Sequence, residues 1–230
     1  MTLTSFAPGL HAVIIGASGG IGAALADLLE ADPGVAAVTR LSRATGLDLT
    51  DPASITAAAS LAAPPDLVIV ATGLLHAEGL APERALNQLS ADAFAQAFAV
   101  NAVGPALVAQ AFLPLLPNSR KTVFAALSAR VGSIGDNRLG GWHAYRASKA
   151  ALNQLLRTIA IEQARKNPAT IILGLHPGTV DTGLSKPFQR NVKNLFTASE
   201  SAAHLLTVID AATPAQSGRV FDWQGAEIAP

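Results

Sequence analysis

Two kinds of hydrophobic pattern alternate along the chain. Short apolar runs, which are typical of buried strands, cover residues 10–15, 35–42, 67–73, 121–128, 170–178 and 217–223. Longer segments with apolar residues every three or four positions, which are typical of helices, cover residues 20–31, 52–61, 90–114, 142–166 and 197–210. This alternation predicts an α/β fold, with a doubly wound parallel sheet and helices on both faces. Without a linker or internal repeat, residues 1–230 are expected to form a single domain.

The most apolar segment of the chain runs from Ala91 to Leu116. It is interrupted by Asp92, Gln96, Asn101, Gly104 and Gln110. No apolar run in it approaches the roughly 18 uninterrupted residues of a membrane span, so a buried helix explains this segment better. The N-terminal residues lack the charged start of a signal peptide. We therefore expect a cytoplasmic protein that does not bind membranes.

The composition excludes several kinds of chemistry. The chain has no cysteine, which excludes disulfides, thiolate nucleophiles and cysteine-based metal sites. Its 16 basic residues balance its 16 acidic residues, so no broad field favours binding to nucleic acid. The five histidines lie far apart in the sequence, without the spacing of metal ligands, and no metal site is expected: they are His11, His76, His143, His176 and His204.

A glycine-rich turn follows the first predicted strand and opens the first predicted helix. It reads Gly16-Ala17-Ser18-Gly19-Gly20-Ile21-Gly22. Its glycines allow the backbone to turn tightly and approach a pyrophosphate, whose charge the free N–H groups of the helix attract. Tight strand–helix turns also need glycine when they bind nothing. Its place between a strand and a helix, near the N-terminus, favours a dinucleotide site.

Tyr145 and Lys149 are four residues apart, so they lie on one face of the helix predicted over residues 142–166. An ammonium group near a phenol favours the phenolate and lowers the phenol pKa from about 10. Tyr145 could then exchange a proton with a substrate. The alternative is a tyrosine that packs and a lysine that snorkels. The pair follows the glycine turn by about 130 residues, and this arrangement favours the catalytic interpretation.

The GxxxGxG turn and the Tyr145-Arg146-Ala147-Ser148-Lys149 motif together resemble the short-chain dehydrogenase/reductase family, over roughly residues 10–223. The segments SARVGSIGDNRLGGWHAYRASKAALN and LHPGTVDTGLSKPF are most similar to its branch of C-factor-like proteins and Sniffer-like carbonyl reductases. The resemblance implies a Rossmann-type fold and hydride transfer between a nicotinamide cofactor and a carbonyl or alcohol. It makes Tyr145 the acid/base, has Lys149 orient the ribose, and assigns a proton-relay water to Asn101. Alternatively, Asn101 bonds only its own helix backbone.

The resemblance also implies which residues bind the cofactor. Asp48 and Leu49 would contact the adenine, and the Pro177–Thr182 turn would hold the carboxamide. Ala71-Thr72-Gly73 occupies the place of a family strand end, with only the glycine strictly kept. The full expected set is Gly16, Ser18, Gly19, Gly20, Ile21, Gly22, Ser42, Arg43, Asp48, Leu49, Ala71, Thr72, Gly73, Tyr145, Lys149, Pro177, Gly178, Val180 and Thr182.

The residues after the second predicted strand bear on the choice between NAD and NADP. An acidic residue there binds the ribose hydroxyls of NAD, and a basic one accommodates the 2′-phosphate of NADP. The segment reads Thr39-Arg40-Leu41-Ser42-Arg43, with no carboxylate before Asp48. We therefore expect NADP rather than NAD, with Ser42 and Arg43 at the phosphate. The alternative is that both arginines are simply solvated.

One position departs from the family pattern. When the chain is aligned on Gly132, the family serine that hydrogen-bonds the substrate carbonyl falls at Ala129. Ser128 should point to the other side of the strand, because successive side chains alternate. Ser133 precedes Tyr145 by 12 residues and could reach the site from the loop. Ser133 is therefore the candidate catalytic serine, although Ser128 or neither could serve instead.

The sequence thus predicts an NADP-preferring carbonyl reductase or alcohol dehydrogenase that acts on a small molecule. The substrate would be lined by residues 130–143 and 183–196, with Arg138, Trp142, His143 and Phe188 as candidates, although each could equally pack within its loop. One alternative is a different reaction on the same scaffold, such as dehydration or epimerisation. Another is a cofactor-bound signalling protein with little turnover, suggested by Ala129 and by the resembled branch.

Two predicted helices, over residues 91–113 and 145–163, carry apolar residues around their whole circumference. A helix that covers only its own sheet needs one apolar stripe. The resembled family pairs these two helices across a two-fold axis, which is the commonest symmetric arrangement. We therefore expect a homodimer or homotetramer. The alternative is that alanine-rich surfaces simply tolerate water.

Overall fold

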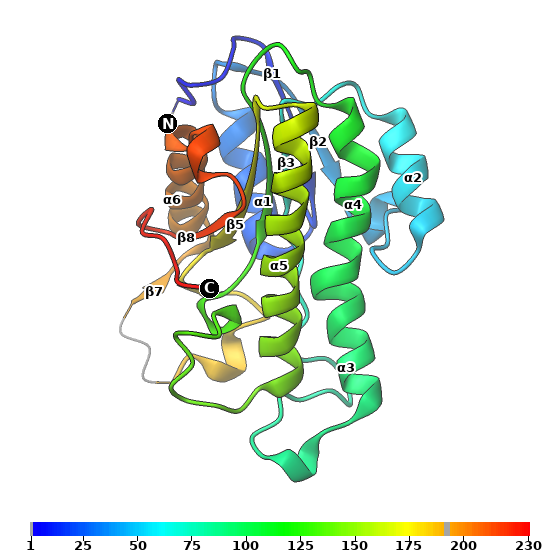
Figure 1. The fold of residues 1–230 in the computed structure, drawn as a ribbon, viewed down its shortest axis with the longest axis vertical. Coiled ribbons are helices and arrows are strands. Elements are labelled where there is room, and N and C mark those ends of the chain that lie inside the picture. Colours follow the sequence, from blue (N-terminus) through cyan, green and yellow to red (C-terminus); the bar gives the residue numbers. More distant parts are fainter. Residues whose placement is uncertain (1, 191–193) are drawn as a thin grey trace.

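In the computed structural model, which describes residues 2–190 and 194–230, six parallel strands form a central sheet (Figure 1). Their order is β2-β1-β3-β4-β5-β8. The chain runs from β1 outwards to β2 and then crosses to β3 on the other side of β1, so the winding reverses between β1 and β3. Ligands of doubly wound sheets bind beyond the carboxyl ends of the strands at such a point. The strands are β1 (Leu10–Ile15), β2 (Val35–Leu41), β3 (Leu67–Val70), β4 (Thr122–Leu127), β5 (Thr170–His176) and β8 (Arg219–Asp222).

Helices cover both faces of this sheet, as the strand–helix alternation predicts. One hydrophobic core joins the sheet to α1 and α6, and a second joins its other face to α2, α4 and α5 (Figure 1). The side chains of β3 and β4 are buried on both faces, which explains their uninterrupted apolar sequences. The helices are α1 (Gly20–Glu30), α2 (Pro52–Leu61), α3 (Ala91–Phe98), α4 (Gly104–Phe112), α5 (His143–Lys166) and α6 (Ala198–Ala211).

Three of these helices, α2, α3 and α6, begin at side-chain caps that the sequence supplies. The Asp51 carboxylate accepts a 3.0 Å hydrogen bond from the backbone N–H of Ala53. At the start of α6, Thr197 Oγ1 accepts from the N–H of Glu200 at 3.2 Å, and the Glu200 carboxylate accepts from the N–H of Thr197 at 2.8 Å. These bonds satisfy N–H groups that have no partner inside the helix.

The apolar segment after Ser90 forms one long helical rod beside α5 (Figure 1). Residues Ala91–Leu115 are long and apolar enough to cross a membrane by length and composition alone, with a mean hydropathy of 1.6. Within the fold, however, Val108 and Phe112 of this rod are fully buried in the core that joins the sheet to α2, α4 and α5. Packing against the sheet and α5 therefore accounts for its apolar character, as the sequence indicated.

A small two-stranded ladder was not predicted. It pairs β6 (Thr179–Val180) with β7 (Leu195–Phe196). Strands of two residues are too short to show an alternation of apolar and polar positions, so no sequence pattern reveals them. The ladder fixes the turn that follows β5, at the carboxyl edge of the main sheet.

Candidate active site

The glycine turn after β1 forms one wall of a cleft at the point where the winding reverses. Gly16 adopts φ +88°, a left-handed conformation that favours glycine. A Cβ at Gly22 would lie 2.2 Å from the carbonyl oxygen of Gly16, so only glycine fits there. Gly20 packs against Thr182, because a Cβ on Gly20 would lie 2.8 Å from the Thr182 methyl group. The turn therefore leaves its backbone open to the cleft at the start of α1.

The cleft has a volume of about 410 Å³. Its chemistry fits a dinucleotide: backbone from a glycine turn at a helix N-terminus, a cationic side chain and an apolar wall. The Oγ1 of Thr72 is buried here without a hydrogen-bond partner in the described part of the chain, as expected where a ligand supplies the partner. Ten predicted cofactor residues line the cleft: Gly16, Ser18, Gly19, Ser42, Arg43, Asp48, Leu49, Ala71, Thr72 and Gly73.

The two arginines that bear on the cofactor choice have different environments. Arg40 is engaged by two carboxylates, since its guanidinium donates to Glu30 at 2.8 Å and also pairs with Asp27. Arg43 is exposed and lines the cleft, and no ion pair holds it among residues 2–190 and 194–230. Asp48, also in the cleft, has its pKa lowered mainly by hydrogen bonds from Thr50. Arg43 is thus the cation that remains available to a phosphate group in the cleft.

Asn101 lies where the long helical rod widens into a π-helix over Ala99–Val103. Its side chain is fully buried and hydrogen-bonds both backbone groups of Leu74. The Oδ1 atom accepts from the Leu74 N–H at 2.8 Å, and Nδ2 donates to the Leu74 carbonyl oxygen at 2.8 Å. Nδ2 also lies 3.1 Å from Ser148 Oγ on α5. Asn101 therefore hydrogen-bonds a neighbouring loop and α5. The alternative, in which it bonds only the backbone of its own helix, is wrong.

Tyr145 and Lys149 lie one helical turn apart near the start of α5. The Lys149 ammonium lies 6.0 Å from the centroid of the Tyr145 ring and donates a 2.7 Å hydrogen bond to the carbonyl oxygen of Leu127. A Cβ on Gly73 would lie 4.0 Å from Lys149 Nζ and 3.9 Å from Asn101 Oδ1. The end of β3 thus brings Asn101 and Lys149 close together, as the motifs predict.

The position of α5 also depends on Glu83, which the sequence analysis did not identify. Its side chain is buried and accepts a 3.2 Å hydrogen bond from the N–H of Ala144, in the first turn of α5. A carboxylate at a helix N-terminus satisfies an unpaired N–H and complements the helix dipole. Glu83 precedes the helix by about 60 residues, in a segment without periodic pattern. No local sequence signal could therefore have revealed the contact.

Burial changes the acid–base properties of Tyr145 and Lys149. It raises the pKa of Tyr145 to about 12 and lowers the pKa of Lys149 to about 7. The expected lowering of the Tyr145 pKa by Lys149 is therefore wrong for the chain without a bound cofactor. Desolvation of the phenolate outweighs its attraction by the ammonium group. At neutral pH Tyr145 holds its proton, and Lys149 is close to the midpoint of its titration.

Tyr145 opens onto a second cavity, of about 210 Å³. This cavity adjoins the dinucleotide cleft, since Leu74 lines the cleft while the next residue, Leu75, lines the cavity. Trp142 forms part of the wall, with its ring 5.1 Å from Phe188 and 6.2 Å from Tyr145. Six predicted cofactor residues line this cavity rather than the cleft: Ile21, Tyr145, Pro177, Gly178, Val180 and Thr182.

Trp142 and Phe188, two of the residues predicted to contact the substrate, both line the cavity onto which Tyr145 opens. Trp142 adopts φ 53°, the one left-handed non-glycine residue within residues 2–190 and 194–230. Such a conformation is strained by about 1 kcal/mol or more and occurs often at functional sites. Two other candidates, Arg138 and His143, do not line the cavity, and Arg138 is exposed to solvent. These two predictions of substrate contact are not supported by the structure.

The serine prediction also needs correction. Ser133 is buried outside the cavity, where its hydroxyl accepts from the N–H of Asp136 at 3.0 Å and lies 3.4 Å from the carbonyl oxygen of Pro230. The 3-10 turn over Arg130–Gly132 directs Ser133 toward the C-terminal residues. Ser128 lines the cavity, but its hydroxyl donates a 2.6 Å hydrogen bond to Asn153 on α5. Ala129, at which the resemblance places the family serine, lines the cavity wall.

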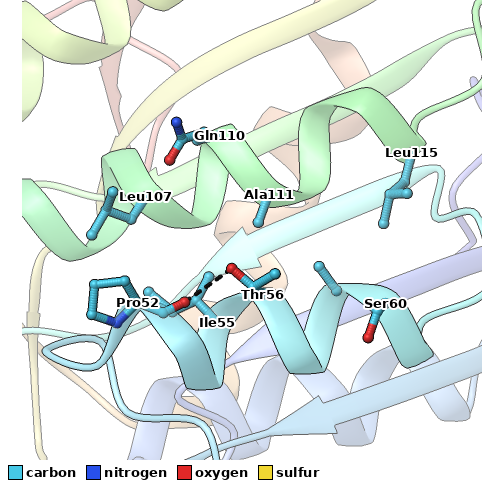
Figure 2. Close-up of a pocket in the computed structure, with 9 residues that line it drawn as sticks. Pro52, Ile55, Thr56, Ser60, Leu107, Gln110, Ala111 and Leu115 are labelled. Atoms are coloured by element: carbon cyan, nitrogen blue, oxygen red, sulfur yellow. Dashed lines mark hydrogen bonds between the residues drawn. The ribbon is translucent and has the colours of Figure 1, made fainter.

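A separate groove of about 390 Å³ lies between α2 and α4 (Figure 2). In Figure 2, Leu107 and Ala111 face Pro52 and Ile55 across it. Among the described residues, the groove is lined by apolar side chains and a few uncharged polar ones, with no titratable side chain. It therefore lacks the chemical groups that the Tyr145 cavity brings together.

Comparison with known proteins agrees with this geometry. A family model described as enoyl-(acyl carrier protein) reductase matches residues 17–217. The chain is 37% identical to the C-signal protein of Myxococcus xanthus over 144 residues, which cover 63% of this chain and 82% of that protein. It is 32% identical to 1-hydroxy-2-glutathionyl-2-methyl-3-butene dehydrogenase of Rhodococcus sp. (strain AD45) over 174 residues, covering 76% of this chain and 74% of that enzyme.

The same fold is found among solved structures. A short-chain dehydrogenase/reductase from Burkholderia multivorans, solved with bound NADP, is 26% identical and superposes with a TM-score of 0.76. The match covers 97% of this chain and 100% of that one. The doubly wound sheet and both of its helical layers are therefore shared over essentially the whole chain.

Proposed function

Because this chain belongs to the short-chain dehydrogenase/reductase family, we propose that it is an NADPH-dependent oxidoreductase that reduces the carbonyl group of a small molecule, or oxidises the corresponding alcohol. One observation carries the proposal. Tyr145 lines a cavity that adjoins a dinucleotide cleft, and Lys149 lies one turn further along the same helix. With Tyr145 as proton donor, the acid of the reaction would lie beside a cleft that fits a hydride-carrying cofactor.

When bound, the nicotinamide supplies a hydride to the carbonyl carbon, and the chain supplies the proton. The Tyr145 hydroxyl would donate its proton to the carbonyl oxygen, so that the product is the alcohol. The pKa of about 12 keeps this hydroxyl protonated at neutral pH, which favours the reductive direction. Oxidation of an alcohol would require the phenolate, so the rate of oxidation should rise at high pH.

Lys149 and Asn101 serve the same proton transfer. An amine with a pKa of about 7 gains and loses a proton easily near neutral pH, so Lys149 is suited to return a proton towards Tyr145 after each turnover. Lys149 would also orient the cofactor ribose. Asn101 holds Leu74 and Ser148 in place by hydrogen bonds, and we assign the relay water to its neighbourhood.

Two observations support NADP over NAD. Arg43 lines the cleft beside the end of β2 without an ion-pair partner among the described residues, so it is available to a 2′-phosphate. The first carboxylate after β2 is Asp48, six residues past Ser42, so none stands where ribose hydroxyls are usually bound. The NADP complex of the Burkholderia protein is consistent with this choice.

The wall of the substrate cavity favours apolar carbonyl compounds. Leu75, Leu184, Trp142 and Phe188 line it together with Tyr145. Arg130, its one charged lining residue among those described, is paired with Asp222 at 2.9 Å and Asp136 at 3.3 Å. A charged substrate would lose water without gaining a free counter-charge. Aryl aldehydes and diketones fit this lining better than sugar or carboxylate substrates.

The proposed setting is a homodimer or homotetramer in the cytoplasm. Val103 on the long helical rod is 49% exposed and Ile161 on α5 is 46% exposed, so apolar side chains remain on the outer surface of both helices. A partner copy could cover them in an isologous contact. The balanced charge of the chain suits a small-molecule enzyme and offers nothing to nucleic acid.

The test is turnover of NADPH and of NADH with 4-nitrobenzaldehyde, benzil and cyclohexanone. We expect NADPH oxidation with at least one aryl carbonyl, faster than with NADH. A protein that binds NADPH but oxidises it with no probe would instead support the rival function, a cofactor-bound signalling protein.

A further inference from the structure

The substrate cavity lacks a free hydroxyl at the place where a carbonyl oxygen would need one. Position 129 at the cavity wall is alanine, and Ser128 beside it already donates its proton to Asn153. Two more hydroxyls of the cavity, those of Ser185 and Thr182, are directed to the carbonyl oxygen of Val180. Thr179 brings the remaining hydroxyl of the lining described here, so the oxygen that Tyr145 must protonate still has no donor at position 129.

His176 offers a second donor. It is the last residue of β5, and the strand next to it ends at Leu127, so the two strand ends lie side by side. The N–H of Ser128 donates to the carbonyl oxygen of Leu175 at 2.8 Å, which joins the residues just before His176 and Ala129. His176, Ala129 and Tyr145 all line the same cavity of about 210 Å³.

The His176 ring has no hydrogen-bond partner among residues 2–190 and 194–230. Its Nδ1 is buried without a partner, and neither ring nitrogen bonds another residue in the described part of the chain. A buried polar atom in this state is unfavourable unless a water or a ligand satisfies it. Asp222, which faces His176 across the β5–β8 pair, is already engaged by Arg130 at 2.9 Å.

The ring is also held in its neutral form. Burial, with a smaller contribution from the Arg130 charge, lowers the pKa of His176 to about 4, against a weaker opposing effect of Asp222. A neutral imidazole carries one N–H donor and one acceptor. Above about pH 5 the residue can therefore donate one hydrogen bond without bringing a positive charge into the cavity.

We propose that His176 donates a hydrogen bond to the carbonyl oxygen of the substrate, in the role that a serine hydroxyl at position 129 would otherwise fill. This inference rests on the proposed function. No proton leaves the imidazole: Tyr145 still supplies the proton, and His176 stabilises the negative charge that develops on the oxygen as hydride reaches the carbon. The substrate oxygen is thus held by two donors from α5 and β5.

The variants His176→Ala and Ala129→Ser, singly and together, test this with 4-nitrobenzaldehyde and NADPH. Removal of one such donor lowers kcat by roughly 10²–10³-fold, so we expect a loss of that order in His176→Ala, with NADPH affinity unchanged. Ala129→Ser should change the wild-type rate by less than about threefold. In the His176→Ala background, Ala129→Ser should raise kcat by at least about tenfold, since a hydroxyl at position 129 then supplies the missing donor.

Two matched variants and a binding measurement exclude a merely structural effect. His204→Ala removes another histidine with a buried, unpartnered Nδ1, outside the cavity, and should retain activity within about threefold. Thr179→Val removes another cavity hydroxyl and should cost less than His176→Ala. Calorimetric titration of benzil into the protein with NADP⁺ should show about tenfold weaker binding in His176→Ala.

The outcomes separate this inference from the proposed function. An active wild type with an equally active His176→Ala would refute the role of His176 and leave the reductase function intact. Equal gains from Ala129→Ser in both backgrounds, or a larger loss in Thr179→Val, would also refute it. A wild type that turns over none of the probes would overturn the proposed function, and the inference with it.

Discussion

The Lys149 ammonium group donates a 2.7 Å hydrogen bond to the carbonyl oxygen of Leu127, the last residue of β4. The side chain is almost fully buried, at 2% exposure, and no carboxylate pairs with it among the described residues. Its pKa falls to about 7 because burial disfavours the charged form. The fold therefore bears a stability cost at the position where the proposed chemistry needs an amine.

Replacing this amine should stabilise the protein in a pH-dependent way. The unfolded chain keeps the Lys149 proton up to pH about 10.5, whereas the folded chain releases it near pH 7. The free energy of unfolding of the wild type therefore rises with pH between about 7 and 10.5. Below pH 7 the full cost of burying the Lys149 ammonium applies. We expect Lys149→Met to raise Tm at pH 6 by at least about 2–4 °C, and by less at pH 9.

Thermal melts monitored by circular dichroism would measure this, with Lys166→Met as the control. Lys166 is 66% exposed and pairs only with Glu162, so its replacement should change Tm little at either pH. A Lys149→Met variant that melts below the wild type at pH 6 would show that the bond to Leu127 outweighs the desolvation.

Arg43 should determine the preference for NADPH. We expect Arg43→Ala to weaken NADPH binding by about 10–100-fold and NADH binding by less than about threefold, because only NADPH carries the 2′-phosphate. Fluorescence titration of both cofactors would measure it. Arg40→Ala is the matched control, since Arg40 is already bound by Glu30 and Asp27. Equal weakening of both cofactors, or a wild type that prefers NADH, would contradict the NADP assignment.

The two serines near the cavity should separate stability from activity. Ser133→Ala removes contacts to Asp136 and Pro230 outside the cavity, so it should change kcat/KM by less than about threefold and lower Tm slightly. Ser128→Ala removes the bond to Asn153 at the cavity wall and should affect kcat/KM more. Steady-state kinetics on both variants would decide. A larger loss in Ser133→Ala would restore the prediction made from the sequence.

Sequence patterns predicted the main sheet and its helices, because burial on both faces leaves uninterrupted apolar runs in β3 and β4. The predicted elements also hold the motif residues: the glycine turn opens α1, Asn101 lies in the middle of the long helical rod, and Tyr145 and Lys149 lie near the start of α5. Such positions follow from the order of the elements alone.

Other features depend on contacts that no local pattern encodes. Glu83 reaches the start of α5 from a loop about 60 residues earlier, and Ser133 turns toward the C-terminal Pro230. The direction of the Tyr145 pKa shift was predicted wrongly because a one-dimensional spacing reports the nearby ammonium but not the desolvation. The position of the unpartnered His176 ring near Ala129 depends on β4 and β5 ending side by side, which the sequence alone does not show.

The outer surface of the long helical rod and α5 should form an interface between copies of the chain. Light scattering at micromolar concentration should give a mass of two or four chains. Ile161→Glu would place a charge on the half-exposed surface of α5 and should shift the mass towards one chain. Leu61→Glu, at an 87% exposed position on α2, should leave the mass unchanged. A wild type with the mass of one chain would refute the assembly.

The most direct test of the account is the rate of NADPH oxidation by Tyr145→Phe compared with the wild type, using 4-nitrobenzaldehyde. The substitution removes the hydroxyl that donates the proton and keeps the ring that packs against Trp142. Fold and NADPH affinity should therefore stay within about twofold of wild type, as measured by circular dichroism and fluorescence titration. We expect kcat to fall by about 10²–10⁴-fold. A Tyr145→Phe variant that retains the full wild-type rate would contradict the proposed mechanism.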